Sequence, residues 1–416
     1  MIQAFYTGIN GMQTSSSGID IVSDNLANAN TVGFRGSNYE FSALFEDAIV
    51  TGSGPTNDAI GLGTSLQATT MTTSSGSYIP TGRSTDLAIL DDGWFGVQGA
   101  GSPEYTRDGS FGFDSEGSLV TQDGYYVLGT MGSNINNGVL TEALGETPLS
   151  DVTAQQKLNF PGELTYPTQA TTIAQFSGNL GTEDVPRTMS SGIIDSQGNT
   201  NTLHLEFTQV NPQPITGTEW SVVATTKSKD GETTYDTQEG TVVFDETGAM
   251  VSSTLTTIDN NGSSVKIDLG SSFDGIVSIS NLDITASSSS DGLVGGDLIG
   301  YDISTTGDVI ATFTNGVQSS VGKVAVYHFQ NDQGLDRLSG TRFADSSNSG
   351  DAFFYTDENG QNVLGTDLFN YKLESSNVDM TYGLTELIIL QRSYDANSKS
   401  ITTADEMMQK ALEMDA

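Results

Sequence analysis

Residues that commonly carry out catalysis are scarce in this chain. It contains two histidines, His204 and His328, and no cysteine. Each histidine lies in an apolar or alternating stretch typical of a strand, so we expect both to be structural. The absence of cysteine excludes disulfides, thiolate metal sites and cysteine nucleophiles.

Motifs for nucleotide, metal or acyl chemistry are equally weak. No His-Glu-x-x-His, Gly-x-Ser-x-Gly or Gly-x-Gly-x-x-Gly pattern occurs. Gly316–Lys323 is one residue too long for a phosphate-binding loop and is not followed by Ser or Thr. Asp357–Gly360 is typical of a turn, and Asp91-Asp92 beside Gly93 is typical of a hairpin tip. We therefore expect no catalytic residue, no metal site and no cofactor, and an enzyme is the least supported function.

The chain is strongly acidic. Its 52 acidic and 15 basic residues give a formal net charge of −37, although only 16% of the residues are charged. Such a surface offers no basic patch for phosphates or anionic lipid, so we expect neither nucleic-acid binding nor membrane docking. Association between copies has to overcome like-charge repulsion and should therefore depend on salt.

Neither a cleaved secretion signal nor a membrane span is predicted. The first basic side chain is Arg35, and the N-terminal stretch lacks the continuous apolar segment of a signal peptide. No window approaches the roughly 18 apolar residues that a spanning helix requires. An exported protein with this sequence would have to leave the cell by a route other than a Sec-type signal.

Both chain ends carry apolar residues at alternating steps of three and four, which predicts amphipathic helices with heptad-like seams. In the first helix, predicted over Met1–Ala29, the seam residues are Ile2, Phe5, Ile9, Met12, Ile19 and Leu26. In the C-terminal stretch Ser375–Ala416 they are Leu384, Leu387, Tyr394, Ile401, Met408 and Leu412. Polar residues from Thr402 to Asp405 make a kink or a frayed turn possible there.

Two interpretations of these helices remain open. They could pack on a globular core, or they could form a coaxial pair made for assembly with other copies. Joining ends that are roughly 340 flexible residues apart costs about 5 kcal/mol, and isolated helices are marginal in water. These energies favour ends that become ordered on contact with other copies, with the seams as the polymerisation surface.

The interior of the chain has the patterns of β structure. Tyr39–Phe45 could form one further helical turn, and the Thr-, Ser- and Gly-rich segment Val50–Gly82 fits a disordered linker and an extended β arm equally well. Leu87–Gly129 is a predicted meander with hairpin turns at four acidic-Gly pairs. A second β region follows over Ile173–Ile284, and the serine-rich run Ala286–Gly292 is a predicted linker.

A third β stretch, Leu293–Lys372, contains an Asn315-Gly316 hairpin turn and leads into the C-terminal helix. The predicted fold is mainly β with α-helical termini: paired, coiled-coil-like end helices and two antiparallel β domains, the outer one inserted into the inner one. The predicted segments are 1–33 with 375–416 for the helices, 34–82 for a connecting arm, 83–172 with 291–374 for the inner β domain, and 173–290 for the outer β domain.

Motifs at both ends resemble those of the bacterial flagellar rod and hook axial proteins. The N-terminal signature runs from Ser23 to Arg35, with Asp24 where that family commonly has Asn. The matching residues are Asn25, Leu26, Ala27, Asn28, Gly33 and Phe34 near the N-terminus, and Asn377, Val378, Asp379, Gln391, Arg392 and Tyr394 near the C-terminus. Tyr105–Gly129 is similar to both distal rod and hook members, whereas Ile194–Leu205 and Gly296–Gly334 resemble hook members.

The resemblance implies a structural subunit of the flagellar hook, a curved hollow tube that acts as a universal joint between motor and filament. The implied partners are further copies of this chain, the hook cap, the distal rod, the hook-filament junction proteins and the flagellar type III export apparatus. A distal rod or other hook-basal-body subunit is an alternative within the family. A secreted β-rich adhesin is the alternative from another class.

Overall fold

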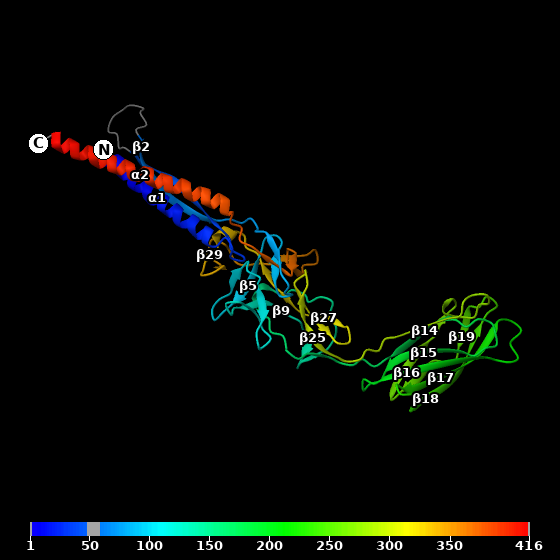
Figure 1. Ribbon diagram of the computed structural model, residues 1–416. Helices are drawn as coiled ribbons and strands as arrows, with labels where there is room; N and C mark the ends of the chain where they lie inside the picture. Colours follow the sequence, from blue (N-terminus) through cyan, green and yellow to red (C-terminus); the bar gives the residue numbers. More distant parts are fainter. Residues whose placement is uncertain (1, 48–58, 415–416) are drawn as a thin grey trace.

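The computed structural model describes residues 2–47 and 59–414. The molecule is elongated, with two helices at one end, a central β body, and a second β region at the opposite end (Figure 1). Secondary structure in the described ranges is mainly β, as predicted, with one long helix near each end of the chain.

The two helices are α1 (Ile2–Ala27) and α2 (Met380–Met414). The predicted C-terminal stretch began at Ser375, but helix α2 begins at Met380. Asp379 caps its first turn by accepting hydrogen bonds from the backbone N–H groups of Thr381 and Tyr382 at 2.8 and 3.1 Å. The helix is continuous through Thr402, so the polar residues there do not break it.

A long hairpin follows α1. Strand β1 (Ser37–Asp47) pairs antiparallel with β2 (Ala59–Met71), so the further helical turn expected at Tyr39–Phe45 is wrong: alternate side chains there serve two faces of a strand. The arm lies along α1, where Asn10 Nδ2 and Thr14 Oγ1 each donate at 2.8 Å to a carbonyl of β2. The described part of the predicted arm is thus extended, and residues 48–58 of it lie outside the described residues.

The central β body combines strands from two distant parts of the chain. Its first part contains β3 (Tyr78–Pro80), β4 (Leu87–Ile89), β5 (Trp94–Gln98), β6 (Glu104–Thr106), β7 (Phe111–Phe113), β8 (Leu119–Thr121), β9 (Tyr126–Met131), β10 (Ile135–Asn136), β11 (Val139–Leu140), β12 (Gln156–Lys157) and β13 (Thr165–Tyr166). Its second part contains β25 (Gly296–Ile303), β26 (Asp308–Phe313), β27 (Gln318–Val324), β28 (Val326–Tyr327), β29 (Asp336–Arg337), β30 (Arg342–Ala344), β31 (Tyr355–Thr356), β32 (Asn362–Val363), β33 (Leu368–Asn370) and β34 (Lys372–Glu374). Buried apolar side chains of both parts form one core.

Turn chemistry predicted some hairpins of this body but not all. The Asn315-Gly316 turn joins the antiparallel strands β26 and β27, as expected, and Gly316 has a φ of +83°. Of the four acidic-Gly pairs, those at Gly117 and Gly124 join paired strands. Those at Gly93 and Gly109 do not, because β4 pairs with β33 and β6 pairs with β5 and β30. An acidic-Gly pair specifies a turn, whereas strand pairing depends on the partner strand.

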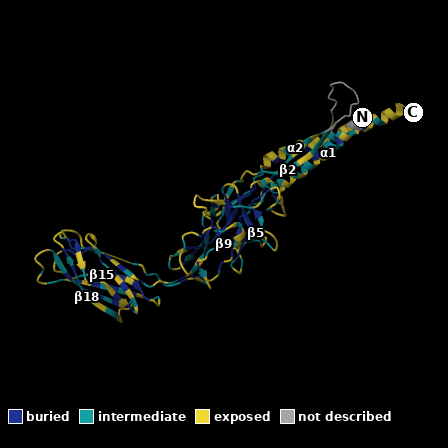
Figure 2. Ribbon diagram, turned by 180° about the vertical axis from the view of Figure 1, so that it is seen from behind, coloured by how far each residue is buried: buried dark blue, intermediate teal, exposed yellow. Residues whose placement is uncertain are grey.

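The far β region is built from two sheets. One has the order β15 (Arg187–Ile194), β16 (Thr200–Gln209), β17 (Thr218–Ser228), β18 (Thr234–Phe244) and β19 (Met250–Ser253). The other has the order β20 (Thr257–Asn260), β21 (Ser263–Asp268), β14 (Ile173–Asn179), β23 (Asp274–Val277) and β22 (Gly270–Ser271), with β24 (Thr285–Ser290) also paired to β14. Their facing side chains form a second core, separate from the first (Figure 2).

Strand β24 corrects the linker expected at Ala286–Gly292. Three of its four serines are exposed, and all four pair with β14 through the backbone. The hydroxyls of Ser288 and Ser290 donate at 2.7 and 2.8 Å to backbone carbonyls of β15, the edge strand of the other sheet. Small hydroxyl side chains therefore join the two sheets at this edge, which composition alone could not reveal.

Candidate assembly surface

The two histidines lie in structural surroundings. His204 projects from β16, and its Nδ1 lies 2.8 Å from Ser190 Oγ. His328 is buried, and its Nε2 lies 2.6 Å from the carbonyl oxygen of Leu364. Burial lowers the pKa of His328, with the nearby Asp332 acting in the opposite direction. Ser190 and His204 are cross-strand neighbours of β15 and β16, and among the described residues no carboxylate is hydrogen-bonded to the His204 ring to complete a catalytic triad. The only hydrogen-bond partner of the His328 ring there is a backbone carbonyl.

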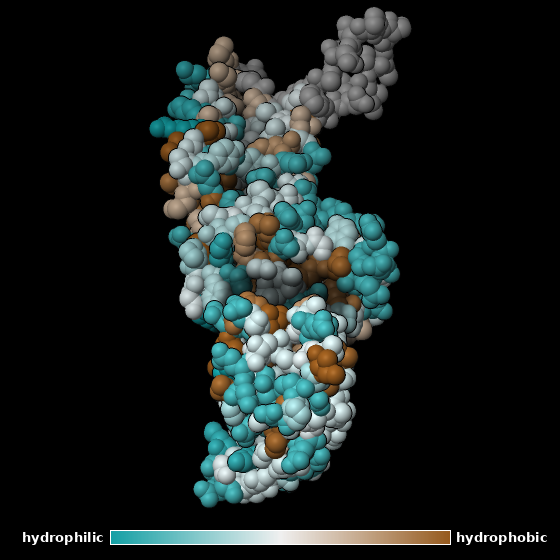
Figure 3. Space-filling view, turned by 90° about the vertical axis from the view of Figure 1, so that its right-hand side faces the viewer, coloured by the Kyte–Doolittle hydropathy of each residue, from teal (hydrophilic) through white to brown (hydrophobic). Residues whose placement is uncertain are grey.

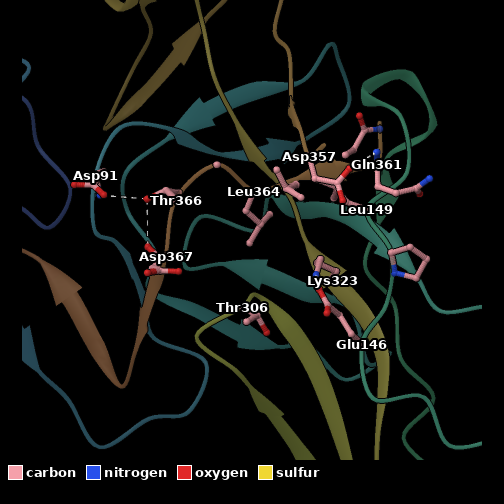
Figure 4. Close-up of a pocket in the computed structure, with 14 residues that line it drawn as sticks. Asp91, Glu146, Leu149, Thr306, Lys323, Asp357, Gln361, Leu364, Thr366 and Asp367 are labelled. Carbon is pink, nitrogen blue, oxygen red and sulfur yellow. Dashed lines mark hydrogen bonds and ion pairs between the residues drawn. The ribbon is translucent and has the colours of Figure 1, made fainter. Parts of the chain in front are cut away.

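A hollow of about 760 Å³ opens on the central body (Figure 4). Its lining carries the carboxylates of Asp91, Glu146, Asp357 and Asp367 together with Lys323. Lys323 lies on β27, with its Nζ 2.5 Å from Glu146 Oε1, so the segment once compared with a phosphate-binding loop is a strand. Within residues 2–47 and 59–414, no group of three or more His, Asp or Glu side chains is placed to hold a metal ion.

The remaining acidic motifs are turns. Asp357 accepts hydrogen bonds from the backbone N–H groups of Asn359 and Gln361, both at 2.8 Å, in the loop between β31 and β32. These donors lower the pKa of its carboxyl group. Asp91 is exposed, and its backbone N–H donates to Thr366 at 3.2 Å (Figure 4). Both arrangements satisfy loop geometry and leave no reactive pair of carboxylates.

Helices α1 and α2 contact each other through small residues of α1. Ideal Cβ atoms built on Gly8, Gly11 and Gly18 would lie 2.7 Å from Ile401, 2.6 Å from Asn397 and 3.0 Å from Leu390, respectively. A larger residue at these positions would push the helices apart. The sequence reasoning concentrated on large apolar residues and missed these glycines, although their spacing places them on one helix face.

The structure places the expected seam residues in two settings. Phe5, Ile9, Met12, Ile19 and Leu26 of α1 are half-buried, as are Leu387, Ile401 and Met408 of α2, whereas the side chain of Ile2 is not among those described. Leu384, Tyr394 and Leu412 are exposed. On α2 the fully buried positions are Gly383, Leu390 and Ala404, so the face toward α1 is offset by one residue from parts of the expected seam.

Large apolar side chains remain exposed on the helix pair. On α2 they are Met380, Tyr382, Leu384, Ile388, Ile389, Tyr394, Met407, Leu412 and Met414, and on α1 Tyr6. Exposed large apolar side chains in this number on one element are typical of binding surfaces. The far β region is different, because its viewed face is mostly hydrophilic with scattered apolar side chains (Figure 3). We call the outward apolar surface of α1 and α2 the assembly surface.

A buried ionic cluster joins the helices to the central body. Glu374, just before α2, lies between Arg35 of the segment after α1 and Arg107 of the body, at 2.9 and 3.4 Å. The side chains of Arg35, Glu374 and Arg107 are only 2%, 1% and 3% exposed, respectively. Glu374 Oε1 also accepts the backbone N–H of Gly76 at 2.9 Å. Burial lowers the pKa of Arg107 to about 10.

The N-terminal motif residues surround this junction. Asn25 exchanges side-chain hydrogen bonds with the backbone of Ser37 at 2.7 and 2.8 Å. Gly33 has a φ of +67°, and a Cβ there would lie 2.4 Å from the backbone nitrogen of Asp108, so only glycine fits. Phe34 is buried beneath the Arg337 guanidinium at 4.8 Å. The other three expected residues are the half-buried Leu26 and Asn28 and the exposed Ala27.

Some residues of the C-terminal motif lie at the junction, and others are exposed on α2. Asn377 accepts the backbone N–H of Gly36 at 2.8 Å and donates to the carbonyls of Thr72 and Ser74. Val378 is half-buried, and its Cγ2 would lie 3.1 Å from a Cβ on Gly36. Asp379 caps α2, as described above. The remaining expected residues, Gln391, Arg392 and Tyr394, are exposed on α2.

Four family models match successive parts of the chain. A flagella basal body rod protein model matches residues 5–35, and a flagellar hook protein FlgE/F/G D1 domain model matches 88–175. A flagellar basal body protein FlaE D2 domain model matches 180–314, and a flagellar basal body rod FlgEFG protein C-terminal model matches 371–414. The matches therefore include the two helical ends and both β regions.

Several relatives that match along nearly the whole chain are flagellar hook proteins. The flagellar hook protein FlgE of Brucella suis is 30% identical over 97% of this chain and 96% of its own, and that of Salmonella typhimurium is 27% identical over 97% and 98%. The crystal structure of Helicobacter pylori flagellar hook protein FlgE2 matches the fold with a TM-score of 0.55 at 17% identity, covering 71% of this chain and all of the other. From its end motifs, its β regions and these full-length matches, this chain belongs to the flagellar hook protein FlgE family.

Proposed function

We propose that this chain is a structural subunit of the bacterial flagellar hook and polymerises through its terminal helices. The observation that carries the proposal is the assembly surface, where large apolar side chains of α1 and α2 point away from the rest of the chain. Full-length similarity to hook proteins supports the same role. The family is structural and not enzymatic, in keeping with a hollow lined by paired and turn-forming residues.

In the proposed polymer the helices form the inner wall of a hollow tube, paired as in a coiled coil. Residues 83–172 and 291–374 form a middle domain, and residues 173–290 form an outer domain inserted into it. Two separate cores support this division, because the first joins strands from both sides of the intervening segment. The segments 1–33 with 375–416 then act as the assembly domain, and 34–82 connects it to the middle layer.

We further propose that the tube is curved and acts as a universal joint for motor torque. The outer β region supports this because its exposed surface is rich in Ser, Thr and Asn, whose hydrated contacts can slide without uncovering a large apolar area. The assembly surface would keep the tube continuous during bending. Burial of one Leu-sized side chain contributes about 1.5–3 kcal/mol, so several such contacts can offset the electrostatic repulsion between copies.

The proposal also includes location and partners. The subunit would belong to the hook of the bacterial flagellum, outside the cell, between the distal rod and the hook-filament junction proteins, with assembly beneath a hook cap. Export through the flagellar type III apparatus, without a cleaved Sec signal, would deliver it there. Among the described residues no helix is both long and apolar enough to cross a membrane.

Removal of either helix tests the polymerisation role. Variants that lack residues 2–30 or 380–414 should keep both β cores folded but form no tubes, as seen by circular dichroism and negative-stain electron microscopy. A variant that still forms tubes would contradict the proposal. A control substitution away from the helices, Asp302→Asn at a half-buried position of β25, should assemble like the unchanged protein.

A rod subunit is the second candidate, because the models that match residues 5–35 and 371–414 are named for basal body rod proteins. Immunogold labelling of the parent cell with antibody to 173–284 separates the two. Gold on a short curved tube outside the envelope identifies a hook subunit, whereas gold on a straight rod within the envelope identifies a rod subunit. Gold scattered over the cell surface would instead indicate the adhesin.

A further inference from the structure

Contacts between α1 and α2 define which residues of the two helices lie at the same position along the common helix axis, that is, level with each other. Gly8 lies beside Ile401, Gly11 beside Asn397, and Gly18 beside Leu390, and Ser15 Oγ lies 3.3 Å from Ser393 Oγ. The numbers rise along one helix as they fall along the other, so the helices are antiparallel. By the same relation, Tyr6 is level with Thr402 of its own α2.

Apolar residues of the two helices form two patches at different positions along the helix axis. The first patch, near the start of α1, consists of Tyr6, which is 56% exposed, and the half-buried Phe5 and Ile9; the ring centroids of Tyr6 and Phe5 lie 6.4 Å apart in an edge-on arrangement. The second patch is Leu384, Ile388 and Ile389 near the start of α2, where the two isoleucines are 58% and 61% exposed. The first patch lies toward the free end of the helix pair, and the second lies toward the β body.

Within one copy these patches cannot meet. Thr402, the residue level with Tyr6, is 14 residues from Ile388 along α2. At 1.5 Å per residue this corresponds to roughly 21 Å along the helix axis. By the same relation, Asp20 and Asp24 of α1 in the same copy are level with Ile388 and Leu384, and both aspartates are exposed. The two patches therefore do not cover each other within one copy.

A second copy displaced along the axis brings the patches together. We propose that Phe5, Tyr6 and Ile9 of one subunit pack on Leu384, Ile388 and Ile389 of the next, which is displaced by roughly 21 Å along the helix axis. This inference rests on the proposed function and adds the contact and its axial step. The displacement places Phe5 level with Ile389 and Tyr6 level with Ile388.

Two properties favour a second copy of this chain as the partner of each patch. The two patches differ from each other, so a contact between them joins successive copies head-to-tail. Because each copy is also displaced along the axis, repeating this contact produces an open helical polymer and not a closed ring. Moreover, a net charge of −37 opposes association of identical chains. The two patches contain no charged residue, so this contact does not bring carboxylates directly against one another.

The absence of cysteine from the chain allows a direct cross-linking test. Full-length Tyr6→Cys and Ile388→Cys proteins are polymerised as a 1:1 mixture, oxidised, and examined on non-reducing gels. Because a disulfide requires Cα atoms within about 7 Å, the proposed contact predicts a heterodimer band from tubes and none from oxidised monomers. The matched control uses Met407→Cys in place of Ile388→Cys. Met407 is similarly exposed, at 55%, but lies at a different position along the helix axis.

The outcomes separate this inference from the proposed function. Tubes whose Tyr6–Ile388 heterodimer band clearly exceeds the Tyr6–Met407 band support the contact. Tubes with no such band, or with equal bands, overturn the contact and its displacement while leaving the hook role intact. For cysteine variants that form no tubes, Tyr6→Asp and Ile388→Asp proteins are mixed, because each keeps one intact patch. Sedimentation should then show heterodimers in the mixture and monomers of each protein alone, and monomers throughout would overturn the contact.

Discussion

Glu374→Gln is expected to destabilise the central β body strongly. The carboxylate lies 2.9 Å from Arg35 and 3.4 Å from Arg107, and none of these side chains is more than 3% exposed. At an effective dielectric of about 20, each attraction is about 5 kcal/mol before desolvation and the repulsion between the arginines are subtracted. Glutamine keeps the shape but leaves two buried cations without a counter-charge, so we expect a loss of about 3–5 kcal/mol.

The position of the two tryptophans makes this loss measurable for one core at a time. Trp94 lies in the core of the central body and Trp220 in the core of the far β region, and the chain has no other tryptophan. In a Trp220→Phe background, the fluorescence of Trp94 during urea unfolding reports the central body. In a Trp94→Phe background, Trp220 reports the far region, where Glu374→Gln should have no effect.

The matched control is Glu358→Gln, which removes one negative charge from the exposed turn between β31 and β32. Its effect should stay within about 0.5 kcal/mol, as for ordinary surface substitutions. A Glu374→Gln protein whose Trp94 transition shifts no more than this control would refute the reasoning, because the buried arginines would then not depend on the carboxylate. A Trp220 transition that shifts equally would show that the effect is not local to the junction.

Four further outcomes follow from single sites. Gly11→Leu should weaken helix pairing and tube formation, because a Cβ at this position would lie 2.6 Å from Asn397. Gly383→Ala should instead raise the stability of the helix by about 0.5–1 kcal/mol, measured by thermal circular dichroism, because no atom lies within 4 Å of the added Cβ. Burial lowers the pKa of His328, so the unfolded chain takes up a proton that the folded chain resists, and stability of the central body should fall as the pH drops below about 6.5. His328→Gln should flatten this dependence between pH 7.5 and 5, and an unchanged slope would exclude the ring as its source. Asp195→Ala should lower the stability of the far region by about 2–3 kcal/mol, measured by Trp220 fluorescence. The substitution removes an acceptor of two backbone N–H groups and three asparagine side chains. A loss below about 0.5 kcal/mol would mean that water replaces the carboxylate.

Local patterns predicted most individual elements of this protein. The helices at both ends, strand β5 (Trp94–Gln98) and the hairpin at Asn315-Gly316 were readable from apolar period and turn residues, and the structure confirms them. These features depend on residues within a few positions of one another, so a short window contains the relevant information. The mainly β character with helical ends and the family-specific end motifs were also accessible in this way.

The errors occurred where a distant partner decides the structure. The serines of β24 had the composition of a linker, yet β14 pairs with them through the backbone. Tyr39–Phe45 suggested a helical turn, but the partner β2 makes it a strand. At Gly93 and Gly109 the turn chemistry was recognised, while strands elsewhere in the chain determine the pairing.

The amino-acid sequence by itself therefore determined the local elements, the acidic character and the family motifs of this hook-family chain. Only the tertiary structure decided which face of α2 meets α1, and it selected Gly8, Gly11 and Gly18 as the contact, which leaves Ile388 and Ile389 exposed. It also assembled Arg35, Arg107 and Glu374 from three distant segments. The physical reason is that helical period and turn preference arise from covalent neighbours, whereas close packing and buried ion pairing require surfaces that meet only after the chain has folded.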